Sequence, residues 1–178
     1  MKLEKIELKS FRAYKNQEFK IDPEKNIILI HGNNGFGKTS FFDGVEWGFT
    51  GKIERYSTSS KEKNEYPMLK NYFANKDEDG FSSIQLSGPV DFKRSIKQTG
   101  ESDFNEGTLS INQNYLEKLL IKEAYFDKVS FSDRFNFSHL LSQELLSSFI
   151  RDVKDTDRYQ IIVKLFGLEN YEKFNPAF

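Results

Sequence analysis

The amino-acid sequence predicts an α/β fold, and three features near its N-terminus lead to that prediction. Strand-like runs come first, over residues 3–8 and 19–21, with a turn at Asp22-Pro23 after them. The apolar, β-branched run 26–30 then has the composition of a buried parallel strand. After it, apolar side chains recur at helical spacing until a Thr-Gly stop; they are Phe41, Phe42, Val45 and Phe49.

A glycine-rich loop joins the expected parallel strand to the expected helix. Residues 32–39 read G-N-N-G-F-G-K-T, which matches the phosphate-binding loop G-x-x-x-x-G-K-[ST] at each required position. Gly35 and Gly37 would let consecutive backbone N–H groups approach a triphosphate without Cβ collisions. The alternative is a plain glycine-rich turn with an exposed lysine, but the flanking strand and helix favour a nucleotide site. The sequence thus predicts a phosphate-loop nucleotide-binding domain.

The residue types of this loop suit magnesium and ATP. Lys38 would place a positive charge on the β- and γ-phosphates, and the Thr39 hydroxyl would bind the Mg²⁺ ion that bridges them. The start of a helix also favours an anion. A bulky residue at position 36 is unusual, and we expect it to pack over the loop or to contact a partner. The expected nucleotide contacts in the loop are Asn33, Asn34, Gly35, Phe36, Gly37, Lys38, Thr39 and Ser40.

Composition sets broader limits on the function. The chain has 178 residues and a net charge of −1, so it can form one core but lacks the basic character of a nonspecific nucleic-acid-binding domain. It has no cysteine, which excludes disulfides and thiolate metal sites. No apolar stretch is long enough to span a membrane, and no signal-peptide core is visible. We therefore expect a cytoplasmic protein without a membrane partner.

The order of the elements narrows the class further. Small GTPases and many nucleoside kinases run from their first strand almost directly into the phosphate loop, whereas ABC-type ATPases place antiparallel strands first. Here two strand-like runs precede the loop. The sequence therefore favours an ABC-type ATPase fold, with antiparallel N-terminal strands and a mixed core sheet.

Two stretches at the N-terminal end, 3–12 and 26–40, resemble the start of SMC-like ATPase heads. Among these heads, the sequence pattern is most similar to that of SbcC and its double-strand-break-repair relatives. Further along, residues 140–150 are similar to the glutamine loop and the following helix of those heads. Arg158-Tyr159 and 165–171 look like the segment that leads into their coiled coil.

The resemblance implies roles for two further residues. Arg12 would reach the nucleotide phosphates, a task that suits a bidentate guanidinium, although a lone arginine is often a plain surface residue. Gln143 would lie near Mg²⁺ and the attacking water. As a neutral amide it would position the water rather than take its proton. Lys38 and Gln143 are therefore the expected catalytic residues, and Thr39 and Gln143 the expected metal ligands.

The resemblance also implies missing parts. SMC-like heads are built from both ends of a long chain, and the C-terminal half brings the Walker B strand, the catalytic glutamate and the signature loop. The stretch 86–89 superficially resembles a signature loop, but Pro89 makes it a turn. We expect 1–167 to be the N-terminal lobe of such a head, and 168–178 to be the start of a coiled coil or a truncated linker. The chain would then be a truncated piece or one part of a split protein.

The rest of the chain predicts secondary structure rather than chemistry. Residues 52–79 read as an exposed polar loop that could also contact DNA or cover the adenine, and 81–96 as a hairpin that extends the antiparallel sheet. Apolar stripes predict helices over 114–121, 145–153 and 159–166.

Other ionisable residues offer weak candidates. His31 and His139 are not spaced as a metal pair; the first would flank the loop, and the second would pack or hydrogen-bond. Asp43 and Glu46 on the helix after the loop read as solvated charges.

Three functions stay open at this stage. The first is an ATPase head whose nucleotide-dependent dimerisation acts on DNA in repair, chromosome organisation or defence. It would work with a complementary C-terminal half, a second head as a homodimer, and a nuclease or other effector subunit. The second is a nucleotide-dependent binding module with little turnover. The third, a self-contained phosphate-loop kinase or GTPase, needs a Walker B aspartate in this chain, for which 125–127 is a faint candidate.

Overall fold

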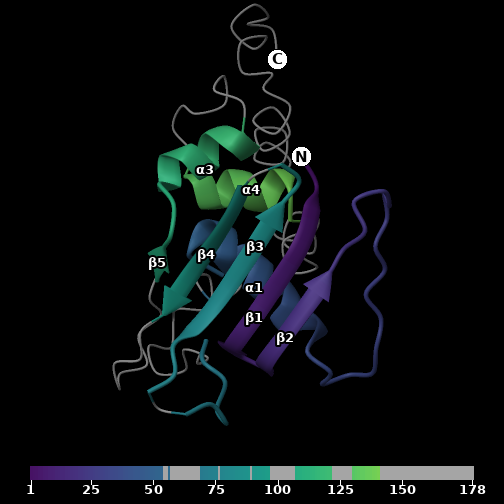
Figure 1. Cartoon of the computed structure of the whole chain (residues 1–178), viewed down its shortest axis with the longest axis vertical. Helices are drawn as coiled ribbons and strands as arrows, with labels where there is room; N and C mark the ends of the chain where they lie inside the picture. Colours follow the sequence, from purple (N-terminus) through teal and green to yellow (C-terminus); the bar gives the residue numbers. More distant parts are fainter. Residues whose placement is uncertain are drawn as a thin grey trace, which may run out of the picture. The chain divides into compact units, whose positions relative to one another are not determined.

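The computed structural model describes residues 1–53, 56, 69–75, 77–88, 90–96, 107–121 and 130–140, apart from the side chain of Phe137. Contacts divide the chain into two compact units, Met1–Leu116 and Glu117–Phe178. The first unit contains a sheet, the phosphate-loop segment and one long helix (Figure 1). The predicted helices over 145–153 and 159–166 and the segment 168–178 lie outside the described residues.

The sheet of the first unit has five strands in the order β2-β1-β3-β4-β5, and each neighbouring pair is antiparallel. Its members are β1 Leu3–Phe11, β2 Tyr14–Lys20, β3 Gly80–Leu86, β4 Val90–Ile96 and β5 Thr108–Leu109. The two early strands pair as a hairpin, with Ile6 opposite Phe19. Strands β3 and β4 form the second expected hairpin, whose turn holds Gly88 at φ 96°. These parts of the sequence prediction are confirmed.

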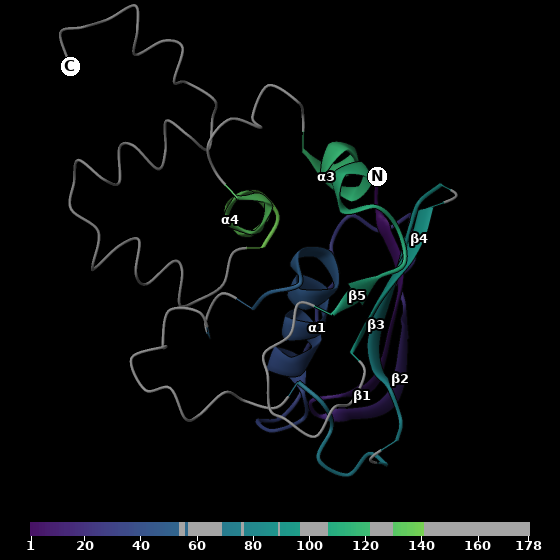
Figure 2. The ribbon, with the colours of Figure 1, turned by 90° about the vertical axis from the view of Figure 1, so that its left-hand side faces the viewer.

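Helix α1 (Lys38–Thr50) lies along one face of this sheet (Figure 2). It ends at Gly51, whose left-handed backbone lets its N–H donate to the Trp47 carbonyl, so the predicted stop is confirmed. The approach to the sheet is close, since a Cβ at Gly44 would lie 2.6 Å from a methyl group of Leu8. The Ser82 hydroxyl also donates to the Gly44 carbonyl at 2.8 Å. These contacts fix the helix that carries the loop.

The C-terminal end of α1 is held by a buried arginine of β4. Arg94 is 4% exposed. It donates to the carbonyls of Gly48 and Phe49 at 3.1 and 3.2 Å, and to the side chain of Gln113 at 3.0 Å. The last carbonyls of a helix have no partner within the helix, so this cation satisfies them and also favours the negative end of the helix dipole.

The expected parallel strand at 26–30 is wrong for this structure. The segment has no strand geometry and pairs with no described strand. Ile27 is 88% exposed, Ile28 52% and Leu29 83%. A buried parallel strand needs neighbours to take its backbone hydrogen bonds, and none of the described strands lies beside it. The sheet of the described residues is consequently all antiparallel rather than mixed.

The expected apolar face of α1 also needs correction. Phe41, Val45 and Phe49 are buried, but Phe42 is about half exposed. Asp43 and Glu46, expected to be solvated, are buried instead. The buried face of the helix contains Ser40, Asp43, Gly44 and Trp47. It therefore includes polar side chains, and the buried carboxylates of Asp43 and Glu46 have partners of their own.

The expectation of an exposed loop over 52–79 is wrong for several of the described residues in that range. Ile53, Leu69 and Asn71 are buried, and Lys70 forms an isolated β-bridge with Phe11. The segment 69–71 therefore pairs with the C-terminal end of β1 through a single antiparallel bridge.

The remaining described helices are short. Helix α3 (Gln113–Leu120) matches the helix expected over 114–121, and Leu116 is its buried residue. In the second unit, α4 (Phe131–Ser138) begins at Ser130, whose hydroxyl accepts the Asp133 N–H as an N-cap. Stacking of His139 on Phe135 at 5.3 Å and its contact with the Ser138 hydroxyl confirm that this histidine packs and hydrogen-bonds.

Candidate functional site: the phosphate loop and its arginine

The phosphate loop has the backbone that its glycines predict. Gly35 and Gly37 adopt φ angles of 87° and 89°, in the left-handed region that L side chains rarely enter. The Lys38 ammonium folds back on the loop and donates to the carbonyls of Gly32 and Asn33 at 2.6 and 2.9 Å. No carboxylate pairs with Lys38 among the described residues. The loop thus holds an ammonium whose charge is available to an anionic ligand.

The start of α1 is open in the way that anion binding requires. Gly37 is the N-cap and provides no side-chain hydrogen bond, and the first backbone bond of the helix runs from the Phe41 N–H to the Gly37 carbonyl at 2.9 Å. The N–H groups of the first turn therefore have no intrahelical acceptor. No acidic side chain lies in that turn. Positively polarised N–H groups remain for the oxygens of a phosphate.

The other predicted loop residues divide by exposure. Asn33, Asn34 and Thr39 are exposed, whereas Ser40 is buried. Phe36 is 74% exposed, so it does not pack over the loop. His31 is exposed at the start of the loop, as expected from its position. The exposed Thr39 hydroxyl suits a metal ligand, while the burial of Ser40 favours packing.

Tyr14, at the start of β2, supports the phosphate loop by a hydrogen bond, a role that the sequence analysis did not predict. Its hydroxyl donates to the Gly37 carbonyl at 2.9 Å. Burial raises the pKa of Tyr14, which keeps the phenol protonated as a donor. The ring contacts Phe19 at 5.4 Å between centroids, and Phe19 in turn contacts Phe41 at 4.8 Å. This aromatic row ties the loop to the β1–β2 hairpin.

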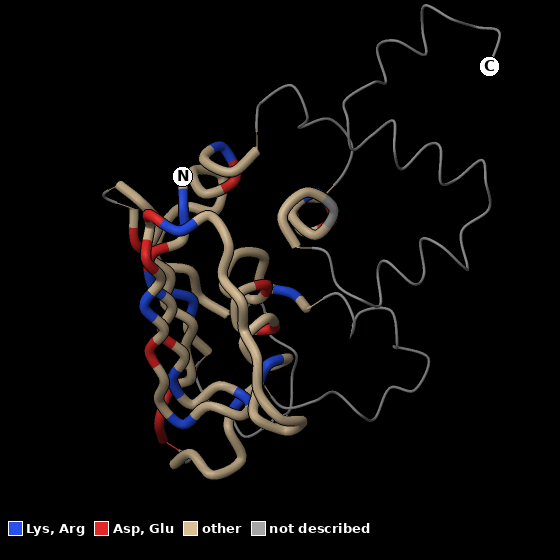
Figure 3. The backbone as a smooth tube through the Cα atoms, turned by 90° about the vertical axis from the view of Figure 1, so that its right-hand side faces the viewer, with Lys and Arg blue, Asp and Glu red and all other residues tan. Residues whose placement is uncertain are grey.

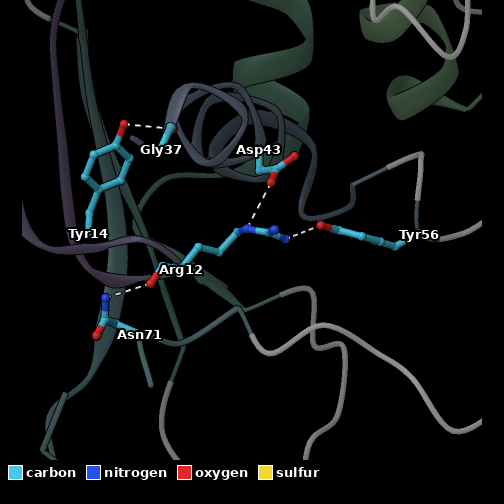
Figure 4. A network of polar contacts seen from close by, with 6 residues as sticks. All are labelled: Arg12, Tyr14, Gly37, Asp43, Tyr56 and Asn71. Carbon is cyan, nitrogen blue, oxygen red and sulfur yellow. Dashed lines mark hydrogen bonds and ion pairs between the residues drawn. The ribbon is translucent and has the colours of Figure 1, made fainter. Parts of the chain in front are cut away.

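Arg12 lies at the end of β1 and reaches α1 (Figure 4). Its Nε is 3.0 Å from Oδ2 of Asp43, and its Nη1 donates to the Tyr56 hydroxyl. The guanidinium also stacks over the Tyr56 ring, 5.2 Å from the centroid. The structure thus brings the predicted arginine to the helix that begins at the phosphate loop, and adds two partners that the sequence analysis missed.

A signal for one of these partners was present in the sequence. Asp43 lies between Ser40 and Trp47 at intervals of three and four residues, which places it on one helical face with a large aromatic residue. A carboxylate on a buried face needs a cation, and Arg12 is that cation. Tyr56 carries no comparable signal, since it comes from a polar stretch without periodicity.

The predicted metal site is described only in part. Thr39 is in place at the start of α1, and Gln143 lies outside the described residues, as does the faint acidic candidate at 125–127. Within the described part of the chain, no group of three His, Asp or Glu residues could hold a metal ion. A magnesium ion here would therefore depend on the Thr39 hydroxyl, on phosphate oxygens and on groups beyond the described residues.

Comparisons with known proteins agree with the fold. A protein family described as "AAA domain" matches residues 5–175. The chain is 28% identical over 172 residues to the "Probable DNA double-strand break repair Rad50 ATPase" of Aquifex aeolicus, covering 95% of this chain and 17% of that protein. It is 24% identical over 182 residues to "Structural maintenance of chromosomes protein 6" of Dictyostelium discoideum, covering 96% of this chain and 15% of that protein. The chain thus spans about a sixth of the length of these curated relatives.

A solved structure shows the same fold. It comes from work on the ATP-driven dimerisation and DNA-stimulated activation of SMC ATPases, and it matches 93% of this chain and 99% of its own chain. The TM-score is 0.60 at 17% sequence identity. The predicted fold, an ABC-type half-head of α/β class, is confirmed. In the described part of the chain, no helix combines the length and apolarity needed to cross a membrane.

Proposed function

Because this chain belongs to the AAA domain family, over residues 5–175, we propose that it is the ATP-binding N-terminal half of an SMC-like ATPase head. The observation that carries the proposal is the phosphate loop itself. Its left-handed glycines, its Lys38 without a carboxylate partner among the described residues, and an open helix start together form a site for a phosphate chain. The similarity to the Rad50 ATPase and the SMC protein supports ATP as the nucleotide.

The residues of the site would divide the work of binding. Lys38 would exchange the carbonyls of Gly32 and Asn33 for phosphate oxygens, and the first-turn N–H groups of α1 would donate to the same oxygens. Arg12 would add a guanidinium from β1. Thr39 would hold Mg²⁺, which neutralises charge on the β- and γ-phosphates. Gln143 would orient the attacking water, because a neutral amide cannot act as a base.

We propose further that a complementary half completes the site. Three adjacent apolar side chains, Ile27, Ile28 and Leu29, are exposed immediately before the loop. Such a β-branched run suits a strand that is covered on both faces, and a second half with its own strand would provide that cover. The same half would bring the acidic residues that hydrolysis needs. We therefore expect Leu29→Lys to fold normally, because the side chain is exposed, and to weaken association with that half.

Head dimerisation and DNA contact would be properties of the complete assembly. Along the sheet, Lys and Arg alternate with Asp and Glu (Figure 3). Several are paired, such as Lys5 with Glu18 at 2.6 Å and Lys9 with Glu78 at 2.8 Å. The described part of the sheet thus presents no stripe of one sign that would bind DNA by itself. A second head, DNA, a nuclease partner and a cytoplasmic location belong to this proposal.

One observation favours the alternative of a binding module with little turnover. Helix α1 carries two carboxylates, both buried, and Asp43 pairs with Arg12. A carboxylate in an ion pair is poorly suited to accept a proton from water. The pairing of Asp43 with Arg12 thus supports a module that binds nucleotide with little turnover.

The proposed binding is tested with a fluorescent ATP analogue and Mg²⁺. Lys38→Ala is expected to weaken the affinity at least a hundredfold, because a charge-assisted contact to phosphate is worth about 3 kcal/mol. Lys25→Ala, which removes an equal charge from an exposed turn, is the matched control and should leave the affinity within about twofold. Equal affinities of the two variants would refute the proposed site.

A further inference from the structure

The backbone around Arg12 is held in an uncommon conformation. Ser10 and Arg12 have φ angles of 46° and 47°, and they are the described non-glycine residues with positive φ. Such a residue costs about 1–2 kcal/mol and persists only where its surroundings enforce it. The pair stands at the end of β1, where the chain turns toward the nucleotide side of α1.

The segment 69–71 enforces this conformation. The Arg12 N–H donates to the Leu69 carbonyl at 2.6 Å, and the Asn71 N–H donates to the Ser10 carbonyl at 2.9 Å. The Asn71 side chain also donates to the Arg12 carbonyl at 2.7 Å. Both backbone groups of Arg12 are therefore fixed by one short segment.

The side chain of Arg12 is held by residues other than those that hold its backbone. Asp43 is 3% exposed and faces Nε, and the Tyr56 hydroxyl accepts from Nη1 (Figure 4). A guanidinium has five N–H donors in a rigid plane; Nη1 donates one of them to Tyr56, and Nε faces Asp43 in an ion pair. Within the described residues Nη2 makes no hydrogen bond or ion pair, and the side chain remains 19% exposed. The contacts to Asp43 and Tyr56 hold the guanidinium, and the N–H donors of Nη2 stay available to an anion.

We propose that Asp43 and Tyr56 are positioning residues, which hold the Arg12 guanidinium so that its Nη2 donors meet the phosphates of the bound nucleotide. The inference rests on the proposed function, because it requires that the loop binds a phosphate chain. Asp43 lies five residues into α1 from Lys38, about 7.5 Å along the axis. A guanidinium anchored there is within the length of a phosphate chain of the helix start. Without the anchor, Arg12 would lose rotamer entropy on binding and would bind more weakly.

The test is a double-mutant cycle on Mg-ATP affinity, measured with the same fluorescent analogue on Arg12→Ala, Asp43→Asn and the double variant. We expect Asp43→Asn to weaken binding about tenfold. In the Arg12→Ala background the same change should cost less than twofold, because there is no fork left to position. Losses that multiply in the double variant, or an unchanged affinity of Asp43→Asn, would overturn the proposal.

Tyr56→Phe covers the case in which Asp43→Asn fails to fold. This change keeps the ring that stacks on the guanidinium and removes only the acceptor hydroxyl. It should weaken binding about threefold, and the loss should vanish in the Arg12→Ala background. A Tyr56→Phe variant that binds like the parent, or that loses the same factor without Arg12, contradicts the positioning role.

Two controls separate this inference from the proposed function. Glu18→Gln breaks the ion pair with Lys5 on the sheet and should leave Mg-ATP affinity within about twofold. Lys38→Ala should abolish binding whatever the state of Arg12. If Lys38→Ala binds like the parent, the phosphate site is wrong and the positioning role falls with it. If only the coupling to Asp43 is absent, the positioning role alone is refuted.

Discussion

Replacing Arg94 by methionine tests how the loop-bearing helix is held on the sheet. The change keeps much of the side-chain volume but removes the guanidinium. The carbonyls of Gly48 and Phe49, at the end of α1, lose their donor, and so does the side chain of Gln113. Arg94 is 4% exposed, so water does not readily replace these bonds.

The expected loss of stability follows from these contacts. A buried carbonyl without a partner costs about 1–3 kcal/mol, so two of them cost about 2–6 kcal/mol. Removing a buried cation recovers part of this, because its desolvation cost disappears as well. We therefore expect Arg94→Met to lower the free energy of unfolding by about 3 kcal/mol. For a chain of this size that corresponds to a drop in melting temperature of about 6–12 °C.

Urea unfolding of the parent and variant chains, followed by circular dichroism, measures this difference. Lys93→Met is the matched control, since Lys93 neighbours Arg94 on β4 but is exposed and lies over the Phe81 ring at 4.0 Å. Its effect should stay within about 0.5 kcal/mol. A loss below about 1 kcal/mol for Arg94→Met would refute the role assigned to this arginine.

The loop glycines provide a second prediction. Gly35→Ala should cost about 1 kcal/mol, because φ is positive and no atom lies within 4 Å of the added methyl. Gly37→Ala should cost about 1 kcal/mol more than Gly35→Ala, because its Cβ would lie 3.0 Å from the Tyr14 hydroxyl. It should also weaken Mg-ATP binding more than Gly35→Ala does. Equal losses of stability for the two variants in urea unfolding would contradict this crowding. A third prediction concerns pH. The hydrogen bond from Lys5 lowers the pKa of Glu18, so its contribution to stability is present above the unfolded-state pKa and is lost as pH falls through the folded one. The stability gap between the parent and Glu18→Gln should close between about pH 6 and about pH 3, and a constant gap would exclude the ion pair.

Local patterns explain which elements the sequence predicted. The glycine loop and the Thr50-Gly51 stop depend on backbone conformations that only a few residue types adopt, so their residues identify them. The alternation of Phe92 and Arg94 with exposed neighbours likewise shows that β4 buries one face. Arg94 occupies one of the buried positions, and the alternation of buried and exposed residues along β4 continues through it. Each of these elements is determined by a few residues that are adjacent in the sequence.

Contacts between distant segments could not be predicted in this way. The burial of Asp43 depends on Arg12, a residue that is remote in sequence and adjacent only after β1 and α1 have packed. The run 26–30 failed for the opposite reason. Its composition is that of a buried strand, but burial requires neighbouring strands that the described residues do not contain. The composition of a segment indicates which secondary structure it favours. Whether a strand forms depends on whether the topology places another strand beside it.

The most direct test of the central claim is Mg-ATP binding and turnover by this chain, alone and with a separately made C-terminal half, each beside Lys38→Ala. We predict that the chain alone binds Mg-ATP, that Lys38→Ala abolishes the binding, and that turnover appears only when the second half is added. Robust turnover by the chain alone would contradict the account and indicate a self-contained phosphate-loop enzyme.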